Sequence, residues 1–303
     1  MKKNFTNDLH EMGLPKMEKQ IYAVIGHPIG HTMSPFIHRR LFELIGKSAK
    51  YVALDISENE LKGKIPELKS LSGFNITIPH KQAIIPFLDK LDEKAALFGS
   101  VNTVHNNGGV YTGYTTDPNG FLKALQAGGA KLNGRNVILG AGGAARVMAF
   151  EAVLAGGMVT LAVRPHSAEK ARQLARDIRS SVKGAKVDIC LLDEVVGNID
   201  VLMNATPVGM YPNVDACPVR TSILKNCAAV FDAVYNPNET VLLRLAKENG
   251  AAAIGGMDML VWQAAAAHEI WDGVQYDIND IQQLCRDSVL EMNRIFGDHQ
   301  NDK

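Results

Sequence analysis

The chain of 303 residues has no excess of charge of either sign, because 32 Lys and Arg balance 32 Asp and Glu. Proteins that attract nucleic acid or an anionic membrane usually carry a basic excess, so neither partner is expected. Aromatic residues make up only 6% of the chain, which argues against a stacking surface for single strands. The 46% of hydrophobic residues is typical of a packed globular protein of about two domains.

Cysteine is also scarce. The four cysteines stand at positions 190, 217, 227 and 285, and none forms a C-x-x-C pair. Neither a zinc knuckle nor a disulfide framework is therefore expected. His27 and His31 have Pro28 and Gly30 between them, so no helix would present both rings to one ion, and we expect no metal site.

Long apolar runs are missing too. The first 20 residues are charged and lack the apolar core of a signal peptide. The most apolar stretch, residues 251–267, is interrupted by Asp258 and favours a buried alanine-rich helix over a membrane span. A cytoplasmic protein is expected.

Short apolar segments alternate with helical ones along most of the chain, which predicts an α/β fold. Residues 20–25, 50–56 and 73–78 are predicted strands, and helices are expected from Ser34, after Ser57 and from Pro79 toward Leu91. A hairpin is expected around residues 106–108. From residue 119 the alternation predicts a parallel sheet with right-handed crossovers. We expect one α/β domain at 1–118 with 257–303, and a Rossmann-like domain at 119–256.

A glycine-rich loop follows the predicted strand at residues 135–139 and precedes an apolar helix. It fits G-x-G-x-x-A, in which glycine permits a tight turn and brings backbone N–H groups close to a pyrophosphate. The alternative is a glycine-rich connection that binds nothing. The expected cofactor contacts in this loop are Gly140, Ala141, Gly142, Gly143 and Ala144.

The end of the next predicted strand bears on the choice of dinucleotide. An NAD site usually has Asp or Glu there, to accept a hydrogen bond from the ribose 2′-hydroxyl. Here the strand runs into Arg164, and no carboxylate appears before Glu169. A guanidinium favours a 2′-phosphate, so NADP is expected, with NAD left open and a solvated Arg164 as the alternative.

Several further segments carry a family resemblance. They are GHPIGHTMSP at 26–35, GFNITIPHK at 73–81, SVNT at 100–103, GYTTD at 113–117, NATPVGM at 204–210, DAVYNP at 232–237 and MLVWQ at 259–263. In this order, and with the glycine loop, they resemble the shikimate dehydrogenase family, from about Ala23 to beyond Gln263. The resemblance implies a substrate domain, an NADP domain and a cleft between them.

The resemblance also implies the activity, which is reversible oxidation of shikimate to 3-dehydroshikimate on the route to chorismate and the aromatic amino acids. Hydride transfer at an alcohol carbon needs a group that exchanges the hydroxyl proton. By resemblance Lys81 and Asp117 form that pair. Taken singly, Lys81 also fits a surface lysine, and Asp117 fits a helix cap before Pro118.

The remaining site residues follow from the same resemblance. Thr32 and Ser34 would hold the substrate carboxylate. The other substrate contacts would be Asn75, Thr77, Asn102, Tyr235 and Gln263. Arg164, Thr206 and Gly256 would join the glycine loop at the cofactor.

Three departures from the family pattern leave alternatives open. Thr32 stands where the family usually has Ser, and Thr115 and Pro118 replace the common Asn and Gly. The cofactor segment keeps only Arg164 of the family's Asn-Arg-Thr. A quinate/shikimate dehydrogenase that uses NAD or both nucleotides, with quinate as substrate, is one alternative. A non-catalytic NADP- or quinate-sensing protein is the other, and a monomer or homodimer is expected in each case.

Overall fold

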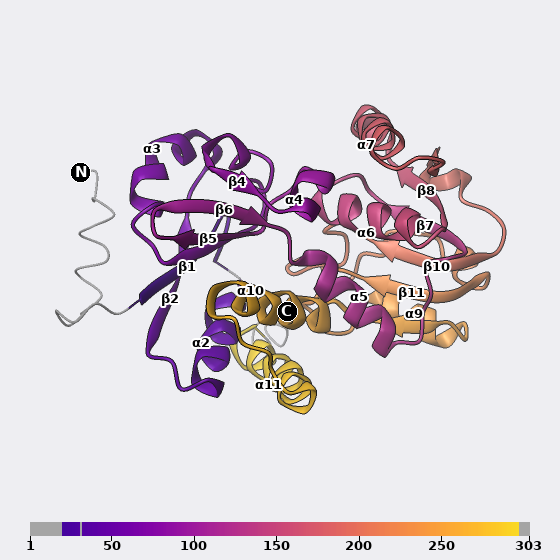
Figure 1. Ribbon diagram of the computed structural model, residues 1–303. Coiled ribbons are helices and arrows are strands. Elements are labelled where there is room, and N and C mark those ends of the chain that lie inside the picture. Colours follow the sequence, from indigo (N-terminus) through magenta and orange to yellow (C-terminus); the bar gives the residue numbers. More distant parts are fainter. Residues whose placement is uncertain (1–19, 31, 297–303) are drawn as a thin grey trace. The chain divides into compact units, whose positions relative to one another are not determined.

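The computed structural model describes residues 20–30 and 32–296 (Figure 1). The chain divides into two compact units. The first unit runs to Thr116 and includes Ala267–Tyr276, and the second comprises Asp117–Ala266 with the chain from Asp277 onward.

The first unit is built on a six-stranded sheet of order β2-β1-β3-β5-β6-β4. Its strands are β1 (Gln20–Gly26), β2 (Ala49–Asp55), β3 (Gly73–Ile76), β4 (Lys90–Leu91), β5 (Thr103–Asn107) and β6 (Val110–Tyr114). The strands β1, β2 and β3 are parallel, whereas β5 runs antiparallel to β3 and to β6. Its helices are α2 (Ser34–Leu44), α3 (Glu58–Leu68) and α4 (Glu93–Phe98).

Alternation along β1 explains why this sheet is covered on both faces. Ala23 and Ile25 enter one hydrophobic cluster, and Tyr22 and Val24 enter another that contains Trp271. Since neighbouring side chains of a strand point to opposite faces, an apolar strand of this kind is buried from both sides. The sequence therefore places β1 in the interior of the sheet.

Two local predictions in the first unit are confirmed. Ser57 and Glu60 form the expected capping box, in which the Glu60 carboxylate accepts from Ser57 N over 3.0 Å. The expected hairpin joins β5 and β6, with Asn107 opposite Val110.

The helix predicted from Pro79 toward Leu91 is wrong. The segment forms turns, a 3₁₀ helix (Ile85–Phe87) and the short strand β4. Pro86 has no N–H for a helical ladder, and the Lys81 carbonyl accepts from Val101 N over 2.8 Å instead. Ile84 N still donates to His80 O over 3.0 Å, but the helical ladder does not continue, because Ile85 N donates to Gln82 O and the Lys81 carbonyl is taken by the segment before β5.

The second unit is built on six parallel strands of order β12-β11-β10-β7-β8-β9. They are β7 (Arg135–Leu139), β8 (Met158–Val163), β9 (Lys186–Leu191), β10 (Ile199–Asn204), β11 (Cys227–Asp232) and β12 (Ala252–Ile254). Its helices are α5 (Asp117–Ala127), α6 (Gly143–Leu154), α7 (Ala168–Ser181), α8 (Thr221–Leu224), α9 (Val241–Glu248), α10 (Gly256–Asp272) and α11 (Ile278–Phe296).

This strand order is that of a doubly wound nucleotide-binding sheet, which confirms the predicted fold class. From β7 the chain continues to β8 and β9 on one side of β7, and then crosses to β10, β11 and β12 on the other side. The direction of the connections therefore reverses between β7 and β10. Ligands of such sheets bind at the carboxyl ends of the strands at this point. The loop at Gly140 follows β7, and Thr206 lies just beyond β10.

The C-terminal helices divide between the units. Helix α10 begins in the second unit, and its last residues belong to the first, whereas α11 belongs to the second. The sequence places the whole of 257–303 with the first block. The assignment of the two units to substrate and dinucleotide remains a prediction. Within the described ranges, no helix is both long enough and apolar enough to cross a membrane.

Candidate active site

Two hydroxyl side chains meet at the start of α2. Thr32 Oγ1 donates to Ser34 Oγ over 3.1 Å and accepts from Ser34 N over 3.2 Å. Ser34 is the first residue of α2, where the sequence predicts a helix to begin, and Met33 takes the N-cap position. Met33 makes no side-chain cap, so among the described residues the side-chain bond at this end of the helix is that of Thr32 to Ser34 N, and the first turn contains no acidic residue. Ser34 N is used by Thr32 and Pro35 has no N–H, so it is the two hydroxyls together with the helix dipole that suit an anion such as a carboxylate here. The neighbouring His31 lies outside the described residues.

Asn75 and Asn102 lie deep in the first unit, at 5% and 2% exposure. Both Asn75 N–H groups are used within the protein, one on Asn102 O at 3.2 Å and one on Thr103 Oγ1 at 3.0 Å. Tyr51 Oη donates to Asn75 Oδ1 over 2.6 Å. Asn75 can therefore offer a ligand one lone pair on Oδ1 and no donor.

Asn102 holds the end of the hairpin. Its Oδ1 accepts from Thr116 N over 2.7 Å, and its Nδ2 donates to Thr116 Oγ1 over 2.9 Å. These bonds tie the residue before β5 to the chain just after β6. Asn102 thus fixes the point at which the chain reaches Asp117.

Lys81 lies in the turn after β3, and Thr77 precedes it on the same turn. Thr77 N donates to Ile25 O over 2.9 Å, and both side chains are half-buried. The fully buried His80 anchors this turn, because its Nε2 lies 2.6 Å from Ile56 O. Sequence reasoning missed His80, although it stands inside the motif that points to Lys81.

Asp117 is the first residue of α5 in the second unit and is 6% exposed. Close packing of α5 against α10 sets the position of this helix. A Cβ at Gly120 would come within 2.2 Å of Met259 O, so glycine is needed where the two helices meet. Gln263 lies on the same part of α10 and donates from Nε2 to Leu260 O over 2.9 Å.

The glycine loop has the geometry expected of a pyrophosphate cradle. Gly140 has a φ of +102°, which L side chains rarely adopt, and a Cβ there would lie 2.9 Å from Thr206 Cγ2. Gly142 is the N-cap of α6, with open space beside its Cα. Helix α6 has neither a side-chain cap nor an acidic residue in its first turn. The N–H groups of Gly143 and Ala144 in that turn therefore suit a phosphate, and the residues present fit a dinucleotide.

Thr206 is part of a network behind this loop. Its Oγ1 donates to Asn204 Oδ1 over 2.7 Å and accepts from Val208 N over 3.3 Å. The hydroxyl proton of Thr206 is thus already used, and its methyl group packs on Gly140. Thr206 contributes the shape of the loop as well as any contact with a cofactor.

Arg164 stands directly after β8 and is exposed. Its backbone carbonyl accepts from Ser167 N over 2.9 Å, and its guanidinium makes no hydrogen bond or ion pair with the residues the structure describes. Arg146, in contrast, is paired with Asp177 at 2.6 Å. Arg164 is therefore available to an anionic group at the end of β8.

Tyr235 follows the carboxyl end of β11, and Gly256 follows the carboxyl end of β12. Tyr235 is partly buried, and burial raises the pKa of its phenol above the usual value. A Cβ at Gly256 would lie 2.5 Å from Ala233 O, so this glycine lets α10 start close to the end of β11. That packing requirement accounts for Gly256 without a ligand.

Metal ligands do not gather in the part of the chain that is described. Within residues 20–30 and 32–296, no group of three or more His, Cys, Asp or Glu side chains could hold a metal ion. The expectation about His27 and His31 concerns a pair whose second member lies outside these ranges. His27 Nδ1 lies 2.6 Å from Asp55 Oδ1.

Comparisons with known proteins identify the family. A sequence model of the shikimate dehydrogenase substrate binding domain matches residues 24–104. The shikimate dehydrogenase (NADP(+)) of Bacillus cytotoxicus is 40% identical over 270 residues, which is 88% of this chain and 97% of that protein. The chain belongs to the shikimate dehydrogenase family.

Other relatives agree over the same length. The shikimate dehydrogenase (NADP(+)) of Methanocaldococcus jannaschii is 38% identical over 279 residues, 90% of this chain and 98% of that protein. A crystal structure of shikimate 5-dehydrogenase from Thermus thermophilus, in complex with NADP(H) and shikimate, has a TM-score of 0.79 at 34% identity. The superposition covers 89% of this chain and 99% of the Thermus thermophilus chain. The resemblance inferred from the motifs is thereby confirmed.

Proposed function

We propose that this member of the family is an NADP-dependent shikimate dehydrogenase that interconverts shikimate and 3-dehydroshikimate, the reductive direction serving aromatic biosynthesis. The observation that carries the proposal is the match, along nearly the whole chain, to enzymes named shikimate dehydrogenase (NADP(+)) at 37–40% identity. The alternatives of a quinate-preferring enzyme and of a non-catalytic sensor have no comparable support.

NADP, when bound, supplies the nicotinamide that accepts or returns the hydride. The residues for it are on the second unit: the N–H groups at the start of α6, the left-handed Gly140 and the exposed guanidinium of Arg164. In the sequence no carboxylate follows β8 before Glu169, so none at the end of this strand would repel a 2′-phosphate. This arrangement supports NADP over NAD.

Lys81 and Asp117 are proposed as the proton-transfer pair. Each is held by its own unit: Lys81 by a turn bonded to Val101 and anchored by His80, and Asp117 by the first turn of α5. An amine and a carboxylate at the reacting hydroxyl can take up and return its proton as the hydride moves. A sensor would need neither residue.

The substrate is proposed to lie against the first unit. Its carboxylate would meet the hydroxyls of Thr32 and Ser34 at the start of α2. A ring hydroxyl would donate to the remaining lone pair of Asn75, with Thr77, Asn102, Tyr235 and Gln263 completing the contacts. Location in the cytoplasm and a monomeric or homodimeric state are further predictions.

The test is a kinetic comparison of four reactions. Purified protein is given shikimate or quinate, each with NADP or NAD, and reduced nicotinamide is followed by its absorbance. The proposal requires the highest kcat/KM for shikimate with NADP. Turnover of quinate alone, or binding of either ligand without any turnover, contradicts it.

A further inference from the structure

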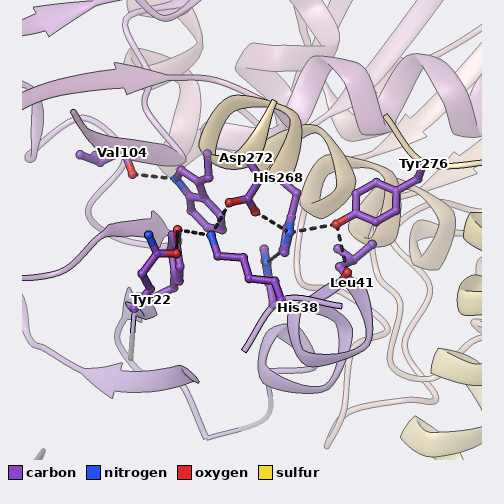
Figure 2. A network of polar contacts seen from close by, with 10 residues as sticks. Tyr22, His38, Leu41, Val104, His268, Asp272 and Tyr276 are labelled. Atoms are coloured by element: carbon purple, nitrogen blue, oxygen red, sulfur yellow. Dashed lines mark hydrogen bonds and ion pairs between the residues drawn. The ribbon is translucent and has the colours of Figure 1, made fainter. Parts of the chain in front are cut away.

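A buried chain of polar side chains joins α2 to the end of α10 within the first unit (Figure 2). His38 Nδ1 lies 3.0 Å from His268 Nε2. On the other side of His268, Nδ1 lies 3.0 Å from Tyr276 Oη and 3.3 Å from Asp272 Oδ2. Both histidines are fully buried, so these contacts are made away from water.

The contacts determine where the protons lie on the two rings. Tyr276 Oη donates to Leu41 O over 3.1 Å, so its oxygen accepts from His268 Nδ1–H. The Asp272 carboxylate beside the same nitrogen also requires a proton there. In a neutral His268 ring Nε2 is then bare and accepts from His38 Nδ1–H, and in a neutral His38 ring Nε2 is bare as well.

The hydrogen bond between His38 Nδ1 and His268 Nε2 requires a proton on one of these two nitrogens and none on the other. Two imidazolium rings could not make it, because all four of their nitrogens would carry protons. His38 Nε2 is buried and has no hydrogen-bond partner among the residues described, so a proton placed on it would also lack an acceptor. The pair is therefore built for neutral rings.

The pair connects to two candidate substrate residues. His38 lies four residues after Ser34, on the same face of α2. Its ring is stacked on Tyr51, with centroids 4.1 Å apart and planes 4° from parallel. Tyr51 in turn donates to Asn75 Oδ1, and so determines which end of that amide presents oxygen.

We propose that His38 is a positioning residue for substrate: through His268 and Tyr51, and with both imidazoles neutral, it fixes Ser34 and Asn75. The inference rests on the proposed function, because those two residues are its substrate contacts. The mechanism above does not use His38, His268 or Tyr51. Their arrangement gives this buried polar group a role that hydrophobic residues of similar size could not fill.

The surroundings oppose protonation of the pair. Burial lowers the pKa of His38 well below its usual value, and His268 lowers it further. Burial also lowers the pKa of His268, although Asp272 opposes that shift. The other titratable groups around the pair are Tyr51, which is stacked on His38, Tyr276, which contacts His268, and Lys47, which bonds to Asp272 and to Tyr22.

The first test uses His38→Phe, which keeps a ring on Tyr51 but removes the N–H. KM for shikimate should rise about tenfold, with kcat and KM for NADP within about twofold, as expected for lost substrate positioning. Tyr51→Phe should act in the same direction. Tyr111→Phe is the matched control, because Tyr111 is also 9% exposed in the first-unit sheet but donates to Lys69 O. Equal effects of Tyr51→Phe and Tyr111→Phe would overturn the proposal.

The second test does not depend on activity. Nitrogen-15 NMR of the imidazoles, assigned by the signal lost in His38→Phe, should show His38 protonated at Nδ1 and bare at Nε2. Toward acid pH, KM for shikimate should rise in the wild type as this signal titrates, and the same rise should be absent in His38→Phe. A His38 protonated at Nε2 at neutral pH, or titrating at the usual value, rejects the proposal even if shikimate is turned over. Absence of turnover with an intact pair rejects the proposed function instead.

Discussion

Asn204 Nδ2 donates to Asp232 Oδ1 over 2.9 Å, across the carboxyl ends of β10 and β11. Asp232 also accepts from Val234 N over 3.0 Å and from Thr240 Oγ1 over 2.7 Å. Because Asn204 holds Thr206 through its Oδ1, one chain of hydrogen bonds fixes the loops after both strands. The loop after β10 carries Thr206 and the loop after β11 carries Tyr235, so this buried carboxylate shapes both.

Asp232 should make the protein more stable as pH falls from 7 toward 5. Burial raises the pKa of Asp232 to about 6, so the folded state takes up a proton that the unfolded carboxyl does not yet bind. Above about pH 6 the folded protein bears the full free-energy penalty of the charged, buried carboxylate. This penalty is gone below about pH 4, the pKa of Asp in the unfolded chain. Its contribution should change by roughly 1–3 kcal/mol over that range.

Asp232→Asn isolates this contribution, since the amide oxygen can still accept from Asn204 and Val234. The free energy of unfolding by urea, measured at several pH values, should depend less on pH in the variant. A difference between wild type and variant that is constant from pH 7 to pH 4 contradicts the assignment.

The His38–His268 pair should contribute in the opposite direction. Both pKa values lie below the usual one, so the unfolded state binds protons first, and the pair's contribution is complete above about pH 6.5 and lost as pH falls. Each proton taken up costs about 1.4 kcal/mol per pH unit in this range. His38→Phe should be less stable than wild type at pH 8, and the gap should narrow by pH 5. A gap that widens toward acid would show that the wild-type pair is not destabilised by protons.

Lys81 and Asp117 should act as one unit. Lys81→Ala is expected to lower kcat by about 10²–10⁴, or ~3–5.5 kcal/mol, with a smaller change in KM. Adding Asp117→Ala should reduce kcat little further, because groups that share one step are not additive. Gln82→Ala, at the exposed next position, serves as the control. Near wild-type turnover of either single variant would remove that residue from the pair.

Ser34→Ala should raise KM for shikimate roughly tenfold, since one hydrogen bond to a charge contributes about 1.5–3 kcal/mol. The Thr32 hydroxyl loses its acceptor in this variant and stays next to the start of α2. Thr32→Ser keeps the hydroxyl pair and should alter the ratio of shikimate to quinate turnover more than KM for NADP. Unchanged substrate kinetics in both variants would place the carboxylate elsewhere.

Arg164→Ala should lower kcat/KM for NADP about ten- to hundredfold and leave the value for NAD nearly unchanged, because only NADP carries the 2′-phosphate. Arg172→Ala is a suitable control: Arg172 is exposed on α7 but already paired with Glu169 at 2.8 Å. If both variants lose the same fraction of NADP activity, general attraction rather than a specific contact is responsible.

Local sequence signals predicted most elements because each depends on neighbours in the chain. The box at Ser57 and Glu60, the hairpin after Asn106 and the turn at Gly140 are all satisfied within a few residues. The helix predicted after Pro79 is wrong because the Lys81 carbonyl accepts from Val101 N, a partner 20 residues away that no local signal reveals.

The candidate site shows the same division. Motif order singled out Lys81, Asp117 and Ser34 as candidates, and the end of a predicted strand singled out Arg164; their roles remain predictions. The sequence could not show that the donors of Asn75 are already used, or that the hydroxyl of Thr206 is bonded to Asn204.

By itself the sequence determined the α/β class, the glycine turn and the family, because periodicity, turn chemistry and ordered motifs are properties of neighbouring residues. Only the tertiary structure decided that His38 and His268, 230 positions apart, share one buried hydrogen bond, and that Asp232 is shielded from water. Burial and pairing arise when distant segments pack together, and they set the pKa and the available lone pairs of a side chain, which its residue type leaves open.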